Sequence, residues 1–251
     1  IITDALFNSV GGQDQFDEVS ILLDRTDKED PNSNEEAMAS LRVSVKSKNA
    51  DLVGRMFSAK MIELALANYP GFFTGGGVRS GGPVLVYWPA LIDSKHIKET
   101  VHVDGKKIEV LPTNQLGLEE IYYQKQPIDV PPAPSDAPLR KPLGELFGAR
   151  SGDKGGCANI GVWAKTENAF SFLNEYLTVE TLKKLMPDVA EFDIDRYELP
   201  NILSLNFYIH GILQDGVSSN TRKDGQAKSL GEYLRSKYID IPKSLIEENL
   251  I

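Results

Sequence analysis

A proline-rich segment constrains the fold of this chain more than any other feature of its sequence. Residues 126–142 hold six of the 14 prolines. Each proline lacks a backbone N–H and favours extended conformations, so neither a helix nor a central strand should run through the segment. The sequence therefore predicts two folded parts, residues 1–125 and residues 143–251, joined by a linker at residues 126–142.

The first part alternates between strand and helix patterns. Leu41, Val43 and Val45 alternate with polar residues, as in a half-buried strand, and the following apolar residues recur every three or four positions, as in a helix that Asn49 can cap. We expect a strand-strand-helix-strand unit followed by a hairpin that turns at Asp104-Gly105. The expected elements are strands at 17–24 and 40–47, a helix at about 50–68, a strand at 84–88 and a hairpin at 101–111.

The second part gives paired strands, a helix, paired strands and a helix. Its long helical pattern can break at Thr178, which could cap a second piece. This order predicts a ferredoxin-like antiparallel sheet with helices on one face, so the fold class of the chain is α+β with two α/β sandwich units. The expected elements are strands at 143–149, 159–164, 192–199 and 202–209, and helices at 168–186 and about 227–237.

Composition excludes several classes of function. The formal net charge of -9 makes the average surface repel nucleic acid and anionic lipid, so an anionic ligand needs a local basic pocket. Apolar runs fall short of the roughly 20 residues that span a bilayer, so we expect no membrane segment. Cys157 is the only cysteine, which excludes an intrachain disulfide and fits a reducing, cytoplasmic location.

The densest polar segment, residues 149–161, lies between two apolar strand patterns. Its glycines let the backbone approach a ligand, and its cations and amides suit a carboxylate, a phosphate or a thioester carbonyl. The alternative is a structural turn held by internal salt bridges. Asp153 could orient a cation or act as a general base, with Lys154 beside it as the second catalytic candidate. The predicted substrate-binding residues here are Arg150, Ser151, Gly152, Gly155 and Asn159.

Cys157 and the histidines carry weaker signals. Cys157 could be a nucleophile beside the basic segment, but no histidine is near it in the sequence, and a buried packing role is favoured. The histidines at positions 96, 102 and 210 lack metal-ligand spacing, so no metal site is expected.

A second polar group lies nearer the carboxyl end. Asn206 is expected on a strand that could lie near the Arg150 segment, and Arg222 could grip a carboxylate with its planar guanidinium. Asp224 and Lys228 complete the predicted binding set. Taken alone, residues 221–228 are more typical of a solvated turn before a helix.

Several motifs resemble the acyclic terpene utilization (AtuA-like) family. The run Leu143–Val162, which contains Gly-Ala-Arg-Ser-Gly-Asp-Lys-Gly-Gly-Cys-Ala-Asn-Ile-Gly, is similar to the signature of that family's carboxy-terminal domain, and Tyr197–Asn201, Leu205–Phe207 and Arg222–Ser229 extend the likeness in order. The strand around Val43 and the glycine-rich stretch before Val84 resemble the family's central region. The resemblance implies breakdown of acyclic terpenes such as citronellol and geraniol, or of related branched acids, and a large amino-terminal domain as an expected partner.

We therefore carry two main hypotheses. The first is an enzyme that adds or eliminates water on a branched hydroxy acid or its CoA thioester, with no cofactor other than the CoA of the substrate. The second is a non-catalytic domain that docks against the amino-terminal region or another subunit of a homo-oligomer. A ligand sensor is a third, weaker reading that depends on fold analogy.

Overall fold

The computed structural model describes residues 1–66, 70–75, 81–110 and 130–249. The chain forms two compact units, Ile1–Leu85 and Val86–Ile251. The boundary predicted between residues 125 and 126 lies outside the described residues.

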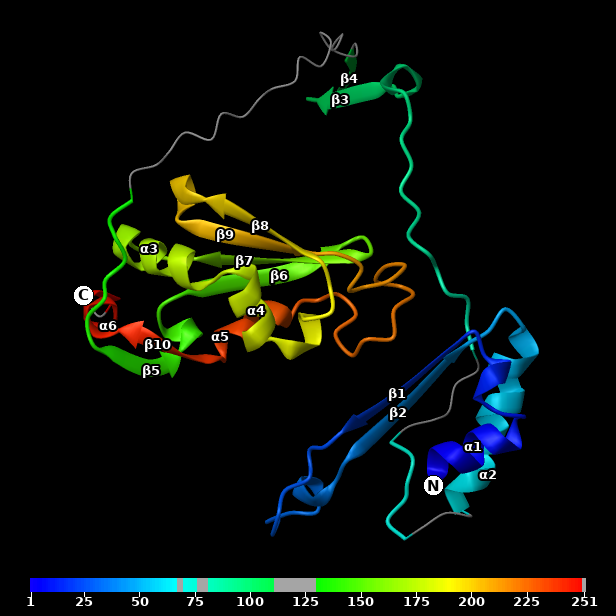
Figure 1. The fold of residues 1–251 in the computed structure, drawn as a ribbon. Helices are drawn as coiled ribbons and strands as arrows, with labels where there is room; N and C mark the ends of the chain where they lie inside the picture. Colours follow the sequence, from blue (N-terminus) through cyan, green and yellow to red (C-terminus); the bar gives the residue numbers. More distant parts are fainter. Residues whose placement is uncertain (67–69, 76–80, 111–129, 250–251) are drawn as a thin grey trace. The chain divides into compact units, whose positions relative to one another are not determined.

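The first unit pairs a two-stranded ribbon with two helices. Strands β1 and β2 are antiparallel, with Glu18 opposite Lys46, as the alternating pattern predicts. Figure 1 shows helices α1 and α2 side by side next to this ribbon. Helix α1 was not predicted. The bounds are α1 Ile2–Ser9, β1 Glu18–Asp24, β2 Ser40–Lys46 and α2 Phe57–Leu66, with short helical turns at Gln13–Gln15, Glu35–Ala37 and Leu52–Met56.

Three phenylalanine rings form the centre of the first unit. Phe7, Phe16 and Phe57 pack with ring centroids between 5.5 and 6.1 Å apart. The helical turns before Phe57 begin at Ala50, as predicted, where the Asn49 side chain accepts a hydrogen bond from the Asp51 N–H at 3.1 Å. This helix is kinked where the backbone of Gly54 departs from helical angles.

The predicted strand at residues 84–88 is wrong, whereas the hairpin after it is confirmed. Residues 84–88 form no strand, and their side chains are between 45% and 85% exposed. Their apolar run resembles a buried strand, but strand formation also requires a neighbouring strand edge. The hairpin of β3 (Glu99–Val103) and β4 (Lys106–Val110) turns through Asp104 and Gly105, both with positive φ.

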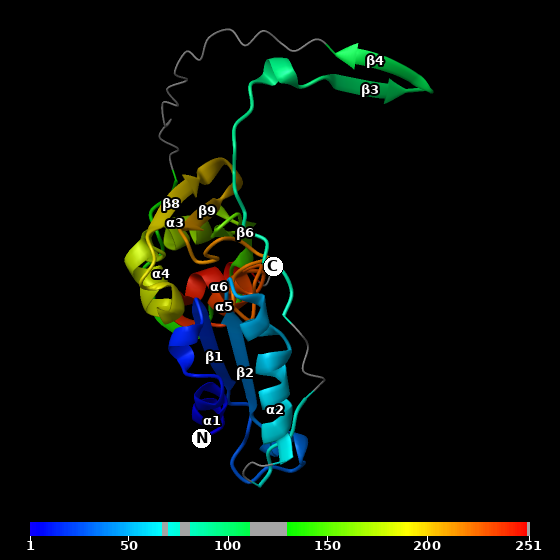
Figure 2. The same cartoon turned by 90° about the vertical axis from the view of Figure 1, so that its right-hand side faces the viewer.

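A four-stranded antiparallel sheet organises the second unit. The strand order is β6-β7-β9-β8, and α3 and α4 connect β7 to β8 (Figures 1 and 2). From β7 onward the order strand, helix, strand, strand, helix is that of the ferredoxin-like motif. Strand β6, which precedes β7, occupies the remaining edge. The bounds are β6 Gly148–Lys154, β7 Cys157–Trp163, α3 Glu167–Tyr176, α4 Val179–Leu185, β8 Ile194–Leu199, β9 Ser204–Ile209 and α5 Leu230–Arg235.

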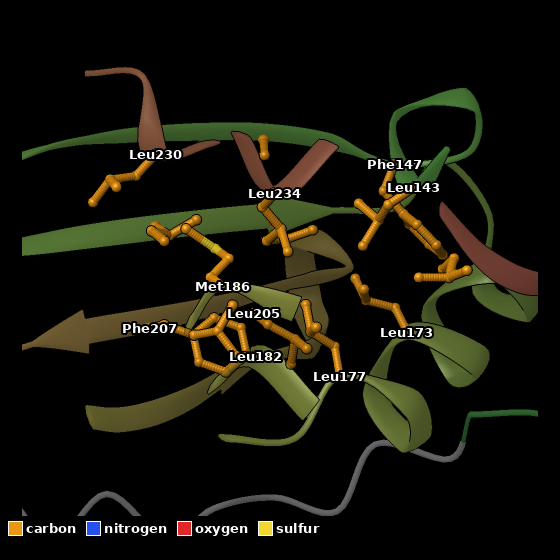
Figure 3. Packing of buried hydrophobic residues seen from close by; sticks show 14 of the residues in the cluster. Leu143, Phe147, Leu173, Leu177, Leu182, Met186, Leu205, Phe207, Leu230 and Leu234 are labelled. Atoms are coloured by element: carbon orange, nitrogen blue, oxygen red, sulfur yellow. The ribbon is translucent and has the colours of Figure 1, made fainter. Parts of the chain in front are cut away.

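The helices bury one face of this sheet, as predicted. Figure 3 shows Leu173 and Leu182 from the helices packed toward Leu205 and Phe207 from β9, and each of these residues is at most 1% exposed. The break between α3 and α4 also falls at the predicted residue, since the Thr178 side chain accepts a hydrogen bond from the Thr181 N–H at 3.1 Å. Among the described residues, no helix covers the opposite face of the sheet.

The end of the expected proline-rich linker forms a strand. Strand β5 (Pro138–Pro142) pairs with β10 (Tyr238–Pro242), and α6 (Lys243–Asn249) follows. Pro138 and Pro142 lie at the two ends of β5, where a missing N–H costs least. The partners are about 100 residues apart, so local sequence gave no indication of this pairing.

The last predicted helix is shorter than expected. Helix α5 begins at Leu230 rather than near residue 227, because Ala227 has a positive φ of 54° that a helix cannot accommodate. Within the part of the chain that the structure describes, none of the helices has the length and apolar character needed to cross a membrane.

Candidate functional site

The expected polar loop at residues 149–161 is instead a strand hairpin. Strand β6 continues through Lys154, and only Gly155 and Gly156 lie in the turn before β7. In an antiparallel pair alternate N–H groups bond to the neighbouring strand, so successive amides cannot converge on one anion. The expectation of a backbone anion receptor is therefore wrong. An edge strand with one open face tolerates polar residues, which is why the segment resembled a loop.

Strand alternation divides the predicted residues between two faces of β6. Ser151 is opposite Ile160, whose side chain is fully buried, so Ser151 and Asp153 project toward the helix-covered face. Arg150, Gly152 and Lys154 belong to the other face, which we call the open face. The predicted residues therefore form two groups rather than one.

Ser151 links β6 to the start of α5. Its Oγ donates a hydrogen bond to the Lys228 carbonyl oxygen at 3.1 Å and accepts one from the Gly231 N–H at 2.9 Å. The hydroxyl therefore acts as both a donor and an acceptor in the contact between the strand and the helix. Ser151 connects the strand to the helix in this structure.

Asp153 forms an ion pair with Lys228, the other predicted residue beside it. The Asp153 Oδ1 and Lys228 Nζ atoms are 3.3 Å apart, and the hydrogen bond from Lys228 is the main cause that lowers the pKa of Asp153. The Lys154 ammonium donates to the backbone oxygen of Asp153 at 3.0 Å. A carboxylate with a lowered pKa is a weak proton acceptor at neutral pH, so the geometry does not favour Asp153 as a general base.

Asp224 and Arg222 make contacts that stabilise the segment before α5. Asp224 accepts hydrogen bonds from the Lys228 N–H at 3.0 Å and from the N–H and hydroxyl of Ser229, each at 2.7 Å. Partial burial raises the pKa of Asp224, but these hydrogen bonds outweigh burial and the net pKa is lowered. Arg222 pairs with Asp188 at 3.3 Å. These contacts fit the alternative reading of a structural segment.

The turn glycines are also explained by close packing. Gly155 has a φ of 65°, and a Cβ there would lie 2.7 Å from the Tyr87 ring. A Cβ on Gly156 would overlap the backbone oxygen of Gln214. The Tyr87 N–H donates to the Asp215 carbonyl at 2.8 Å, so the segment around Tyr87 lies against this turn. The missing side chain at Gly155 therefore leaves room for the Tyr87 ring rather than for a ligand.

Arg150, Asn159 and Asn206 lie on the open face, where the two asparagine side chains contact each other. Arg150 on β6 is opposite Gly161 on β7, which in turn is opposite Asn206 on β9. Gly161 therefore lies between Arg150 and Asn206 across the sheet. The Asn159 Nδ2 donates to the Asn206 Oδ1 at 2.9 Å. Arg150 is exposed and forms no ion pair with any residue in the described ranges. Gly152 is opposite Asn159, and the Lys228 Nζ lies 2.7 Å from where a Cβ of Gly152 would be.

Sequence reasoning missed the other polar side chains of the open face. The Nε2 atom of His210 lies 2.8 Å from the Asp195 Oδ2, and the Tyr197 hydroxyl donates to the same oxygen at 3.4 Å. The Tyr208 and His210 rings contact edge to face at 4.9 Å. Polar and aromatic residues at every second position of β8 and β9 were the available signal.

Cys157 also belongs to this face. It is partly exposed, at the start of β7, and the Gly211 N–H donates to its Sγ at 3.4 Å. The prediction of a buried packing cysteine is therefore wrong, because β7 begins with the side chain of Cys157 directed away from the helix-covered core. Within the described part of the chain, His, Cys, Asp and Glu residues form no group of three or more that could hold a metal ion.

Two family models match the chain. Residues 1–103 match the model described as acyclic terpene utilisation family protein AtuA, and residues 141–240 match the AtuA ferredoxin-like domain. The second match covers β6 to β9 and both faces of the sheet. Comparison with curated proteins and with solved structures gave no match.

Proposed function

We infer, because this chain belongs to the acyclic terpene utilisation family AtuA, that it serves the breakdown of acyclic terpenes or related branched acids. We propose that it does so by binding a branched hydroxy acid or its CoA thioester on the open face. One observation carries the proposal: Arg150, Asn159 and Asn206 share that face, around the empty side-chain position of Gly161.

The chemistry of these groups suits an anionic ligand with an apolar chain. A guanidinium presents a planar set of donors that matches a carboxylate or a phosphate of CoA. On a chain with a net charge of -9 an anionic ligand needs a local cation, and Arg150 supplies one on the open face. Trp163 and Tyr197 are 39% and 51% exposed on the same face and offer apolar surface for a branched chain.

Addition or elimination of water is the reaction that we propose to test first. It requires a proton donor and acceptor beside the ligand, and it requires stabilisation of the charge that develops. Asp153 is on the other face and is paired with Lys228. His210, which contacts Asp195, is an imidazole on the open face that can accept and return a proton.

Thermal unfolding in the presence of ligands tests the binding proposal. Branched acyl-CoA thioesters and branched hydroxy acids should raise the Tm of the wild-type chain, because a ligand that binds only the folded state stabilises it. Arg150→Ala should reduce this protection by weakening affinity about tenfold or more, the loss of one charged hydrogen-bonding partner.

Arg140→Ala provides the matched control. Arg140 is an exposed arginine on β5 that pairs with Asp240 at 3.4 Å, away from the open face. Its replacement should leave ligand protection unchanged. Equal protection of wild type and Arg150→Ala by every ligand that protects either would exclude the open face as the anion site.

A non-catalytic assembly role is the second candidate. The exposed apolar side chains Trp163, Tyr197 and Leu199 favour it, because exposed apolar patches often mark protein contacts. In that case Tyr197→Ser with Leu199→Ser should lower the molar mass measured by light scattering. The ligand-binding role predicts an unchanged mass together with reduced ligand protection.

A further inference from the structure

Cys157 and His210 occupy facing positions at one end of the open face. The last paired residues of β7 and β9 are Ala158 and Ile209, so Cys157 and His210 stand one step beyond this pair on adjacent strands. The hydrogen bond from the Gly211 N–H to the Cys157 Sγ shows that the chain after β9 stays beside the cysteine. Side chains at such facing positions are neighbours on the same face of a sheet.

One hydrogen-bond donor reaches the sulfur of Cys157, namely the Gly211 N–H at 3.4 Å. Cys157 also interacts with Tyr208, and this interaction is the largest cause that raises the pKa of Tyr208, followed by burial. The Tyr208 hydroxyl therefore keeps its proton at neutral pH.

Two contacts of the imidazole and one backbone hydrogen bond position His210. Its Nε2 contacts the Asp195 carboxylate at 2.8 Å, and its ring packs edge to face on Tyr208 at 4.9 Å. Its backbone N–H donates to the Asp193 carbonyl at 3.0 Å. Because Asp195 engages Nε2, Nδ1 is the ring nitrogen left for a second partner, and Cys157 is the residue at the facing position on β7.

We propose that Cys157, His210 and Asp195 form a nucleophile, base and orienting carboxylate that take up the acyl group of a thioester on the open face. A thiol, an imidazole and a carboxylate in this order are the parts that covalent acyl transfer requires. The choice of an acyl thioester rests on the proposed function, whereas the thiol-imidazole site rests on the strand register and on the contacts of His210 with Asp195 and Tyr208.

The proposed step balances without an oxidant or a metal. His210 takes the proton of the Cys157 thiol, and the thiolate sulfur attacks the carbonyl carbon of the thioester. A new carbon–sulfur bond forms to Cys157, the bond from the acyl carbon to the sulfur of CoA breaks, and CoA leaves as a thiol with the proton from His210. The acyl chain is then fixed beside Asn159, which is opposite Tyr208.

Alkylation tests the thiol-imidazole site without knowledge of the substrate. Cys157 is the only cysteine, so intact mass after treatment with iodoacetamide reports on this residue alone. We expect wild-type Cys157 to react faster than glutathione at neutral pH, and His210→Gln to slow it about 100-fold, the lower end of the contribution of a positioned base. Asp195→Asn should slow it less, and Cys157→Ser should give no adduct.

His102→Gln is the matched histidine control. His102 is exposed in the β3–β4 hairpin and should leave the rate of alkylation unchanged. Circular dichroism of each variant establishes that it is folded before rates are compared. A wild-type rate no greater than that of glutathione, or a rate that His210→Gln does not change, would overturn the thiol-imidazole site.

Incubation with isovaleryl-CoA tests the acyl acceptor role separately. An acyl adduct on the wild type that is absent in Cys157→Ser supports the proposal, and the adduct should be lost on treatment with hydroxylamine. Fast alkylation with no acyl adduct overturns the acyl transfer. Ligand protection that depends on Arg150 is measured independently, so the binding proposal can stand or fall apart from this one.

Discussion

Replacing Ser151 with Ala separates a structural role from a ligand-binding role at the centre of the predicted polar segment. The Ser151 hydroxyl donates to the Lys228 carbonyl and accepts from the Gly231 N–H, at 3.1 and 2.9 Å. Each hydrogen bond contributes on the order of 1 kcal/mol, and a partly buried N–H without a partner costs about 1–3 kcal/mol. We therefore expect Ser151→Ala to lower the free energy of unfolding of the second unit by about 2 kcal/mol.

Tryptophan fluorescence can report on this unit specifically. Trp88 and Trp163 are the only tryptophans, and Trp163 is on β7, so urea unfolding in a Trp88→Phe background follows the sheet. Urea midpoints then give the change in free energy. In thermal unfolding the expected shift is a few degrees, roughly 2–4 °C per kcal/mol for a chain of this size.

Ser218→Ala provides the control, because Ser218 is exposed in the segment between β9 and α5. It should change the free energy of unfolding by less than about 0.5 kcal/mol, as most surface substitutions do. Ser151→Ala should also retain the ligand protection of the wild type. A Ser151→Ala variant as stable as Ser218→Ala would refute the connection between β6 and α5, and lost ligand protection at full stability would return Ser151 to the binding site.

Two further predictions concern the turn and the segment before α5. Gly156→Ala should lower the free energy of unfolding of the second unit by more than about 2 kcal/mol, because the added Cβ overlaps the backbone oxygen of Gln214. Gly211→Ala is the control: Gly211 has a positive φ of 69° and open space around it, so this change should cost only about 1–2 kcal/mol. Equal losses of free energy in urea unfolding would show that the turn at Gly156 relaxes. The lowered pKa of Asp224 means that its carboxylate stabilises the fold above the unfolded pKa of about 3.9 and that this stability is lost as pH falls through the folded value. The Tm difference between wild type and Asp224→Asn should therefore shrink between about pH 6 and pH 2, and a constant difference would contradict the assignment.

The central layers of the second unit could be predicted because their signals are local. Alternation identified β8 and β9, and Thr178 marked the break between α3 and α4 by the capping chemistry that the structure contains. The turn at Asp104-Gly105 was predictable for the same reason, since few residue pairs tolerate two successive positive φ values.

Other features depend on neighbours that a local pattern does not identify. The β5–β10 pairing joins residues such as Leu139 and Ile241, and no short window contains both. The polar content of β6 suggested a loop because an edge strand with an open face has few apolar positions. For the same reason the site at Cys157 and His210 escaped sequence reasoning, since strand pairing rather than sequence distance brings these residues together.

The place of β6 at the edge of the sheet has a consequence for the order of folding. Because β6 and β7 are joined by a two-residue turn, this edge can form by zipping a short hairpin, without waiting for a long crossover. Helix α5 lies much later in the chain, so it packs on β6 after the β6–β7 hairpin has formed. Detachment of α5 should therefore be the lowest-energy opening of this unit, detectable as early amide hydrogen exchange in residues 230–235 while β7 and β9 remain protected.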